Sequence, residues 1–460
     1  MASSRGKILW KRTLRPGMKG RDVAILQKHL AALNYYTAEC DGLYGILTKD
    51  AVFDFQKAHR LRVDGIAGKE VFDLLKSGLE RARVEHIVRS GETLSSIAGK
   101  YNVPLELLVS ANNLKTEEVK GGESLFIPVS RLIGFCSPEN PGEPVVSYEH
   151  ILPSLTAVAP RWFSLNEHGN IQGAPDRRFI ALTAMTGVEL WPVISIGRCT
   201  TVQEGVEAQD MLHNILSDNT AYSTAIKSLS SLASRVRAEG LIISIGKLPE
   251  KDVYAFVSFL RKVSRAIKQE GLLLAVEIPL PDETTFRQTG DHRGCLKELG
   301  DIASTAHQVF FRAYKEPSEF SSPGPAISVN RTKTVLRSLT RVVDFWKLII
   351  VVPAFGVDFS AGLGAAPLRK KHSEIMEITD LFKPTVSQLD DEKSKVFRYR
   401  SFRVSHTVYF EDAQSIGAYA DLALRYGLAG IAIADLGDVD PWVWSTLKAR
   451  FKVVRGAVGS

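Results

Sequence analysis

The spacing of apolar side chains divides the chain into two small modules and one large domain. Near the amino end, Val23, Leu26, Leu30 and Leu33 recur at helical spacing, which predicts an amphipathic helix. After this first helical module, short strand-like and helix-like segments alternate over a second stretch. From residue 147 onward, continuous Val, Ile and Leu runs alternate with amphipathic helices, a pattern typical of buried parallel strands. The large domain is therefore predicted to be of the α/β class.

The first module, residues 14–78, is predicted to be all-α, and it contains the turn D-G-x-x-G twice, each time before a helix. The first copy consists of Asp41, Gly42, Tyr44 and Gly45 with the intervening Leu. Glycine allows positive φ, and Asp can bond its own backbone two residues on. One interpretation of these residues is therefore that they only shape turns. The strings G-x-x-G-x-D-V-x-x-L-Q, D-G-x-Y-G-x-x-T and V-D-G-I-x-G resemble the three-helix peptidoglycan-binding domain. The resemblance implies binding of wall glycan or stem peptide near Asp41–Gly45.

The second module, residues 85–128, is predicted to be strand, helix, helix, strand. Its strings G-E-T-L-S-x-I-A, N-N-L and G-x-x-L-x-I-P resemble a LysM domain, a βααβ fold that binds GlcNAc-containing glycans. The resemblance implies a shallow groove between two loops, formed by Gly91, Glu92, Thr93, Leu94 and Ser95 and by Asn112, Asn113 and Leu114. Backbone amides and small polar groups suit an N-acetyl sugar there. Thr93 and Asn113 can equally serve as helix caps.

Residues 129–146 are rich in turn formers, as in S-P-E-N-P-G-E-P, and predict a linker. The large domain, residues 147–460, contains seven strand-like runs, and a weaker run at Val145-Val146 would be an eighth. The seven are Thr156–Phe163, Leu190–Ile196, Leu241–Ile245, Leu272–Ile278, Gln308–Tyr314, Leu348–Pro353 and Gly430–Ala434. Eight strand-helix units favour a TIM-type (β/α)8 barrel. Residues 357–411 are too long for a normal loop and predict a small inserted subdomain between strands seven and eight.

Five stretches of the large domain, among them R-A-E-G-L-I-I-S-I-G, F-R-A-Y and V-P-A-F-G, resemble family 18 glycoside hydrolases. The similarity is to the spore cortex-lytic glucosaminidases that carry LysM modules. In that family the strand-four motif D-x-x-D-x-D-x-E ends in the general acid, and the Asp before it orients the substrate acetamido group. Here only the first acidic position survives, as Glu239. Ser244 stands in the place of the orienting Asp and Gly246 in the place of the acid.

Neither serine nor glycine can protonate a leaving oxygen at neutral pH. General acid catalysis contributes about 10²–10⁴-fold, so the barrel is predicted to be catalytically inactive. Ala434 also replaces the strand-eight Trp that floors the sugar subsite in the family. Tyr314 does match the family's strand-six Tyr. The resemblance implies that this side chain forms a hydrogen bond with the acetamido group. The residues therefore leave room for a remnant sugar pocket without hydrolysis.

Glu277, near the carboxyl end of strand five, is the possible substitute for the missing acid. A structural ion pair with a nearby Lys or Arg is the favoured interpretation of this residue. Three functions follow. The first is a glycan-binding wall or spore-envelope protein with an inactive barrel, the second an active N-acetylglucosaminidase with a relocated acid, and the third a structural or recruiting protein of the spore envelope.

Net charge, cysteine spacing and the length of apolar runs limit the partners and cofactors that the sequence predicts. The net charge is +7 but the charges are scattered, so nucleic acid is not a predicted partner. Four cysteines lie far apart without zinc-finger spacing, which predicts neither a disulfide framework, a metal site nor a cofactor. No apolar run is long enough to span a bilayer, and the amino end has no apolar core of a signal peptide, so synthesis as a cytoplasmic protein is expected. Location in the cell wall or spore envelope is implied by the resemblance alone.

Two weak glycan-binding modules on one chain gain effective concentration on a repeating polymer. Deletion of residues 85–128 should therefore weaken sedimentation with insoluble peptidoglycan by about tenfold or more. Unchanged sedimentation would exclude cooperation between the two modules.

Overall fold

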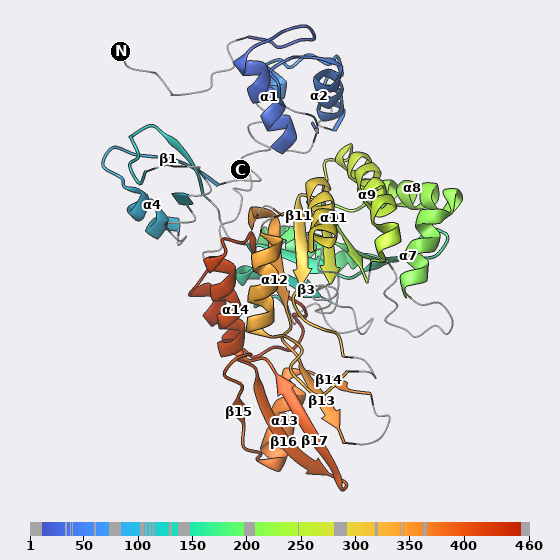
Figure 1. Cartoon of the computed structure of the whole chain (residues 1–460), viewed down its shortest axis with the longest axis vertical. Coiled ribbons are helices and arrows are strands. Elements are labelled where there is room, and N and C mark those ends of the chain that lie inside the picture. The colour runs from blue at the N-terminus through green and yellow to red at the C-terminus, as the bar shows by residue number, and fades with distance from the viewer. Residues whose placement is uncertain are drawn as a thin grey trace. The chain divides into compact units, whose positions relative to one another are not determined.

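The computed structural model describes residues 12–32, 35–36, 38, 40–58, 61–72, 84–101, 105, 108–109, 112, 114, 116–127, 131–136, 148–196, 208–246, 248–279, 292–317, 321–340, 342–343, 345–361 and 366–451. The chain divides into two compact units, one of Met1–Val129 with Arg261–Leu273 and one of Ser130–Leu260 with Leu274–Ser460. No helix in the described ranges is long and apolar enough to cross a membrane. Figure 1 shows the whole chain.

The first module is built on α1 (Arg21–Ala32) and α2 (Ile46–Ala58). Val23, Leu26 and Leu30 of α1 are buried together with Val52 and Phe55 of α2, as the helical spacing predicts. Leu33, the last position of the predicted stripe, lies outside the described residues. A third helical segment begins after the second D-G turn. The apolar faces of the helices thus form a core of their own.

A buried glutamine holds each D-G turn in this module. The Gln27 Nε2 group donates to Asp41 Oδ1 at 2.8 Å, and Gln27 Oε1 accepts from the Gly42 N–H at 2.8 Å. Gln56 makes the same pair of contacts with the second turn, to Asp64 Oδ1 at 2.8 Å and from the Gly65 N–H at 2.8 Å. Gly42 and Gly65 have φ of 74° and 67°, the left-handed region in which glycine is favoured. The repeated turn is therefore a repeated structural device.

The second module pairs β1 (Val84–Ile87) with β2 (Ser124–Ile127) in antiparallel register, Val84 opposite Ile127. Between them, α4 (Leu94–Tyr101) buries Leu94, Ile97 and Ala98. These positions are the ones that the sequence pattern assigns to the helix core. Most of the second helix predicted for this module lies outside the described residues.

The large domain contains a curled, barrel-type sheet. Its parallel strands are β3 (Arg131–Cys136), β4 (Ala157–Pro160), β5 (Phe163–Leu165), β7 (Glu189–Leu190), β8 (Val193–Ile196), β9 (Gly240–Ile245), β10 (Leu273–Pro279), β11 (Gln308–Arg312), β12 (Leu348–Val352) and β18 (Gly430–Ile433). The sheet order is β6-β5-β8-β9-β10-β11-β12-β18-β3-β4-β7, with β6 (Ile171–Gly173) antiparallel to β5. Since β4 leads directly into β5 and β7 into β8, this order returns on itself.

Two predictions about the strands need correction. The segment 129–146 is not only a linker, because Arg131–Cys136 forms β3 and pairs with both β4 and β18. The alternative first strand at Val145-Val146 lies outside the described residues. The predicted runs Thr156–Phe163 and Leu190–Ile196 are each broken into two strands. The second break falls at Trp191-Pro192, where proline has no N–H to donate to a ladder.

Helices surround the strands, as Figure 1 shows. They are α6 (Arg177–Thr186), α7 (Ala208–Ser217), α8 (Asn219–Arg235), α9 (Val253–Lys268), α11 (His292–Thr305), α12 (Val329–Leu339), α14 (Ala413–Arg425) and α15 (Trp442–Lys448). The described residues of this domain also form three short 3-10 turns, η2 (Leu152–Ser154), η3 (Glu250–Asp252) and η4 (Phe345–Lys347). Asp176, Asp218, Ser328 and Asp412 cap α6, α8, α12 and α14 by accepting backbone N–H bonds. The alternation of strand and helix predicted from the sequence is present.

The inserted subdomain projects from the barrel in Figure 1. It comprises β13 (Gly356–Ser360), β14 (Leu368–Lys370), α13 (His372–Phe382), β15 (Ser387–Gln388), β16 (Lys395–Ser401) and β17 (Val404–Phe410). The strands form an antiparallel sheet in the order β14-β13-β17-β16-β15. Ile375 of α13 packs on Phe397, Val408 and Phe410 of the sheet. The subdomain lies between β12 and β18, where the sequence predicts it.

Glu411 follows β17 and lies fully inside the protein, where Ser394 Oγ donates to Oε1 at 2.5 Å. Burial raises its pKa to about 7, although the Ser394 hydroxyl opposes the rise. The folded protein therefore binds a proton that the unfolded chain releases at lower pH. The contribution of Glu411 to the free energy of unfolding is fully present below the pKa of this carboxyl group in the unfolded chain. It is lost as pH rises through the pKa of the same group in the folded protein.

We expect Glu411→Gln to remove this loss. The variant should gain about 3 kcal/mol in free energy of unfolding relative to wild type at about pH 8, and much less at about pH 5. Urea unfolding at both pH values measures the difference, with the exposed Asp391→Asn as a control. An equal gain at both pH values would contradict titration of Glu411 as the cause.

Candidate functional site

The strand-four run lies in β9, where successive side chains point to opposite faces. Ser244 is fully buried, and its hydroxyl donates a 2.5 Å hydrogen bond to Oε2 of Glu277 on β10. Gly246 follows the carboxyl end of the same strand. At the two positions where the resemblance implies carboxyl groups, this chain therefore has a hydroxyl that is already engaged and no side chain.

Glu239, the acidic position that survives, lies at the opposite end of β9. Its Oε2 accepts a hydrogen bond from the Leu190 N–H at 2.7 Å. Burial raises the pKa of Glu239, while the Leu190 N–H works against the rise. The full length of the strand separates this carboxyl from Gly246, so its contacts are with the neighbouring strand β7.

Glu277 is the centre of a buried ion cluster inside the barrel. Its two oxygens accept a bidentate pair from Arg161, with Nη1–Oε2 and Nη2–Oε1 distances of 2.9 Å each. Arg312 adds an Nε–Oε1 contact of 3.3 Å. The carboxylate is 0% exposed. The ion pair that the sequence favours for Glu277 is therefore confirmed, with two arginines in place of one.

The charges in this cluster stabilise one another. Burial alone would lower the pKa of Arg161, but the negative charge of Glu277 and its hydrogen bonds outweigh burial, and the pKa rises above its ordinary value. The same attraction favours the ionised form of the carboxylate. The Arg161 guanidinium also lies 4.5 Å from the centroid of the Phe135 ring on β3. Arg161, Ser244, Glu277 and Arg312 come from four neighbouring regions of the sheet.

Tyr314 lies just beyond β11 and is almost fully buried. Its ring meets that of Phe355 edge-on at 5.6 Å, and its backbone forms a bridge with Ile327. On the other side, Arg369 lies 3.7 Å from the Phe355 ring centroid and pairs with Glu316 at 3.9 Å. Tyr314, which the resemblance implies for acetamide binding, therefore lies among aromatic and charged side chains that follow β11 and β12.

The predicted groove residues of the second module divide into exposed and engaged groups. Gly91, Thr93 and Ser95 are exposed, whereas Leu94 is buried and packs in one cluster with Leu114. Glu92 is engaged: its Oε2 lies 2.7 Å from His86 Nε2 and accepts from the Arg89 N–H at 2.7 Å. These contacts lower the pKa of Glu92, the Arg89 N–H most and His86 next.

Capping is also present in this module. Thr93 Oγ1 accepts from the Ser96 N–H at 3.1 Å, and Asn112 Nδ2 donates to the Leu108 carbonyl at 2.8 Å. Thr93 therefore caps α4 and still exposes its side chain. Asn113 lies outside the described residues. The structure brings Leu94 and Leu114 of the two loops into one core, and leaves Gly91, Thr93 and Ser95 available at its surface.

In the first module, the side chains near the predicted binding turn are mostly structural. Asp41 Oδ1 accepts from the Leu43 N–H at 2.9 Å as well as from Gln27. Those two bonds lower the pKa of Asp41. Tyr44 is 2% exposed, and its hydroxyl donates to the Gly65 carbonyl at 3.0 Å. Gly42 is buried, whereas Asp41, Leu43 and Gly45 are exposed, so this turn presents side chains as well as backbone at the surface.

Sequence reasoning missed Arg161 and Arg312. Each is an arginine placed in or beside a run of otherwise apolar, buried residues, and a buried arginine requires a carboxylate partner. That signal could have paired Arg312 with Glu277, because both strands were predicted. Arg161 is 116 positions away from Glu277 in the chain, and only the closure of the sheet brings them together.

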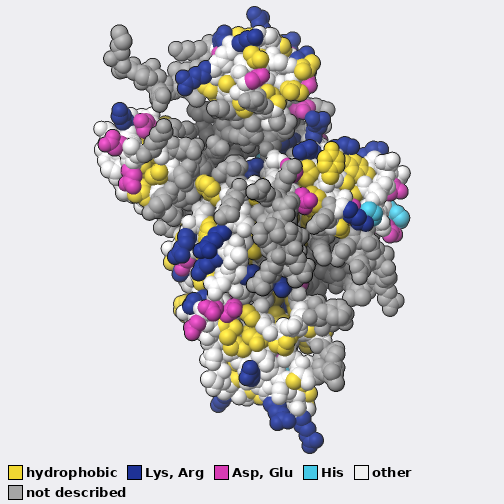
Figure 2. All heavy atoms as spheres, in the orientation of Figure 1, with side chains coloured by type: hydrophobic (Ala, Val, Ile, Leu, Met, Phe, Trp, Pro, Cys, Tyr) yellow, Lys and Arg dark blue, Asp and Glu magenta, His cyan; other side chains and the backbone are white. Residues whose placement is uncertain are grey.

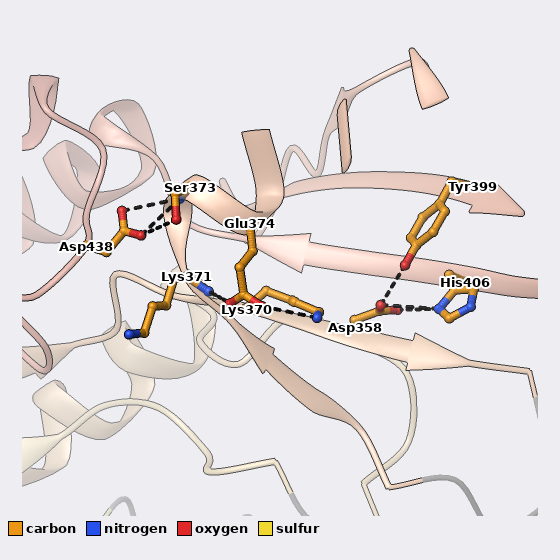
Figure 3. Close-up of polar contacts among 8 residues, drawn as sticks. All are labelled: Asp358, Lys370, Lys371, Ser373, Glu374, Tyr399, His406 and Asp438. Atoms are coloured by element: carbon orange, nitrogen blue, oxygen red, sulfur yellow. Dashed lines mark hydrogen bonds and ion pairs between the residues drawn. The ribbon is translucent and has the colours of Figure 1, made fainter. Parts of the chain in front are cut away.

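A second buried cluster, also missed, lies in the inserted subdomain. Asp358 accepts hydrogen bonds from the Tyr399 hydroxyl at 2.9 Å and from His406 Nδ1 at 3.0 Å, as Figure 3 shows. The Tyr399 and His406 rings stack with centroids 4.6 Å apart. Burial and the Asp358 carboxylate together raise the pKa of Tyr399. The cluster ties β13, β16 and β17 together.

The same view shows how α13 is fixed at its amino end. Ser373 donates from its hydroxyl and its N–H to Asp438, which follows β18 of the barrel. Glu374 accepts from the Lys371 N–H at 2.7 Å and pairs with Lys370 at 3.3 Å. The subdomain is therefore anchored to the loop that follows the last barrel strand.

Metal-ligating side chains and cysteines are also possible functional groups in the sequence. Within the described ranges, no three His, Cys, Asp or Glu side chains are grouped so as to hold a metal ion. Cys40 and Cys136 are free thiols, and burial raises the pKa of Cys136. Cys199 lies outside the described residues.

Comparison with known proteins assigns the two modules. Residues 19–75 match the family described as "Putative peptidoglycan binding domain", and residues 86–128 match the "LysM domain". The chain contains a peptidoglycan-binding domain and a LysM domain. The resemblances drawn from the D-G turns and from the G-E-T-L-S string are therefore confirmed.

The large domain has relatives among glycosylases. The chain is 22% identical over 400 residues to the "Putative sporulation-specific glycosylase YdhD" of Bacillus subtilis, across 83% of this chain and 92% of the relative. It is 23% identical over 307 residues to the "Cortical fragment-lytic enzyme" of the same organism, across 66% of this chain and 69% of the relative.

Solved structures show the same fold. The spore cortex-lytic enzyme SleL of Bacillus megaterium matches with a TM-score of 0.63 and 20% identity, over 81% of this chain and 87% of that one. A chitinase from Chromobacterium violaceum matches with a TM-score of 0.60 and 19% identity, over 69% and 98%. The domain that follows the LysM domain thus has a chitinase-like, barrel-type fold.

The ion cluster makes a prediction about stability. Arg161→Ala removes the bidentate partner of a fully buried carboxylate, and should lower the free energy of unfolding by about 3–5 kcal/mol. The exposed Arg177→Ala should change it by less than about 0.5 kcal/mol. Chemical denaturation followed by tryptophan fluorescence measures both. Equal effects of the two variants would show that Glu277 does not depend on Arg161.

Proposed function

We propose that this protein binds peptidoglycan or another GlcNAc-containing glycan through its two amino-terminal domains, and that its barrel does not hydrolyse the glycan. The observation that carries the second half is the environment of Glu277. The carboxylate is fully buried, paired with Arg161 and Arg312, and bonded by Ser244 at the position of the orienting Asp.

The proposal includes a fold for each of the three domains. We infer a three-helix peptidoglycan-binding domain, a βααβ LysM domain and a (β/α)8 barrel of the family 18 type. The parallel order that returns on itself through the broken strands β4–β5 and β7–β8 supports the barrel. In such barrels chemistry lies at the carboxyl ends of the strands, where Ser244, Glu277 and Tyr314 are found.

A glycosidase of this type needs a protonated carboxyl group at the leaving oxygen and a second group that orients the substrate amide. Glu277 fails the first requirement because two guanidinium groups hold it in its ionised form. Ser244 fails the second because its hydroxyl is donated to Glu277. Tyr314 is the barrel side chain that the resemblance implies for binding of an acetamido group, and such binding requires no hydrolysis.

The proposed glycan contacts are the exposed LysM loop and the first D-G turn. Gly91, Thr93 and Ser95 offer backbone and small polar groups at the surface, beside Asn112 and Leu114. At the peptidoglycan-binding domain, the exposed part of the turn Asp41–Gly45 is the proposed contact, with the buried Tyr44 supporting it from the core. Location in the cell wall or spore envelope rests on these two domains and on relatives whose names refer to sporulation and the spore cortex.

The names of the relatives favour one alternative. Because they include a lytic enzyme and glycosylases, an N-acetylglucosaminidase that uses Glu277 as a relocated acid remains the second candidate. It requires Glu277 to leave Arg161 and take up a proton when substrate binds. A recruiting role in the spore envelope is the third candidate, and it requires no ligand in the barrel.

Hydrolysis separates these functions. Incubation of the full chain with peptidoglycan or chitooligosaccharides should release no new reducing ends above a heat-inactivated sample, while the protein sediments with the insoluble glycan. Release that is lost in Glu277→Gln while that variant keeps the wild-type circular dichroism spectrum, but kept in Glu316→Gln and in Asp435→Asn, would establish the enzyme instead. The two controls are carboxyl groups that follow β11 and β18.

A further inference from the structure

The β16–β17 hairpin of the inserted subdomain ends in an unusual turn. Ser401 and Val404 form the last register pair, so the loop consists of two residues, Phe402 and Arg403. Both have positive φ, 47° and 66°, which is the conformation of a type I′ turn. This turn strongly favours Asn-Gly or Asp-Gly, because residues with larger side chains adopt positive φ at a cost.

A phenylalanine and an arginine at these positions contradict the local preference of the backbone. Such departures occur at functional positions, where the side chain and not the turn is what matters. The rest of the hairpin is well supported. Tyr399 and His406 face each other in the register, stack, and both bond Asp358. The turn therefore sits at the end of a rigid base.

The exposed side chains of this turn also indicate a functional position. Phe402 is 99% exposed, and Val404 beside it is 37% exposed. Arg398, Arg400 and Arg403 are also exposed, and residues 393–410 contain no Asp or Glu. Within the described part of the chain, no ion pair engages these three arginines. Figure 2 shows Lys and Arg side chains gathered at this end of the subdomain.

We propose that the tip of this hairpin binds the surface of an anionic lipid bilayer. Phe402 enters the boundary between headgroups and acyl chains, with Val404 beside it, and the three arginines bind lipid phosphates. Basic residues near an anionic membrane each contribute roughly fivefold to binding, and burial of a Phe side chain contributes about tenfold or more. A soluble polyanion would use the arginines but would gain nothing from an exposed Phe.

The contribution is that of a peripheral contact, comparable to a single weak anchor. It is independent of the barrel interior and of the glycan-binding domains. It places a second surface-binding element on the chain, at the far end of the inserted subdomain from Ser373 and its contact with the barrel.

Vesicle sedimentation of the full chain tests the proposal. The protein should bind vesicles of phosphatidylcholine with added phosphatidylglycerol, bind pure phosphatidylcholine vesicles at least about tenfold more weakly, and lose binding as salt rises. Equal binding to both vesicle types would overturn it.

The decisive variant replaces Phe402 with Asn and Arg403 with Gly. Asn-Gly is the preferred sequence for this turn, so the hairpin should keep its fold and its thermal stability should not fall. Binding to anionic vesicles should nevertheless fall by about fiftyfold, from loss of both the Phe and one charge. Trp442→Ser on α15, which removes another exposed aromatic side chain, should leave vesicle binding unchanged.

Single substitutions separate lipid from a soluble polyanion. Phe402→Asn should weaken vesicle binding by about tenfold, and Arg398→Gln by roughly fivefold. Loss with Arg398→Gln but none with Phe402→Asn would assign the hairpin to an anionic polymer and reject the bilayer. Sedimentation with peptidoglycan, measured in parallel, should be the same for all variants, so a failure of glycan binding and a failure of lipid binding are distinguishable.

Discussion

The carboxylate of Glu277 carries a charge in a place from which water is excluded. An isolated ion there would cost many kcal/mol, so the chain must supply cations and hydrogen bonds at the same point. Arg161 supplies a bidentate pair from the break between β4 and β5, Arg312 a third contact from the end of β11, and Ser244 a hydroxyl from β9. The requirement links these strands inside the sheet, because loss of Glu277 would leave two buried arginines without their carboxylate, and loss of Arg161 would remove the bidentate partner of a fully buried carboxylate.

That arrangement has consequences for chemistry. The interior of a chitinase-like barrel at the carboxyl ends of its strands is where a proton donor and an acetamide clamp would have to stand. In this chain the Glu277 carboxylate and its two guanidinium partners lie near these strand ends, and Gly246 contributes no side chain. The cluster favours a stable charge distribution, whereas a general acid must lose and regain a proton in each turnover. The fold is kept while the local chemistry is of a different kind.

Much of the fold is predictable from the sequence because its strands are continuous apolar runs and its helices are amphipathic. Glycine-bearing turns and the G-E-T-L-S string likewise identify the two small domains. The failures have physical causes. Arg131–Cys136 was assigned to a linker because it follows the LysM domain directly and precedes a segment rich in proline and glycine, so nothing local distinguishes it from a spacer. Arg161 could not be paired with Glu277, because that contact depends on how the whole sheet closes.

Two of the local departures from an expected pattern in this chain carry different kinds of information. At Ser244 and Gly246 the departure is from a family motif, and its meaning becomes clear only with the distant partners of Glu277 in place. At Phe402 and Arg403 the departure is from backbone chemistry itself, since both residues adopt positive φ where glycine or asparagine would do so at less cost. At the first, the Ser244 hydroxyl is donated to Glu277, which supports the proposal that the barrel does not hydrolyse glycan. The second keeps an unfavourable turn so that two side chains stand in solvent, which argues for a partner outside the chain.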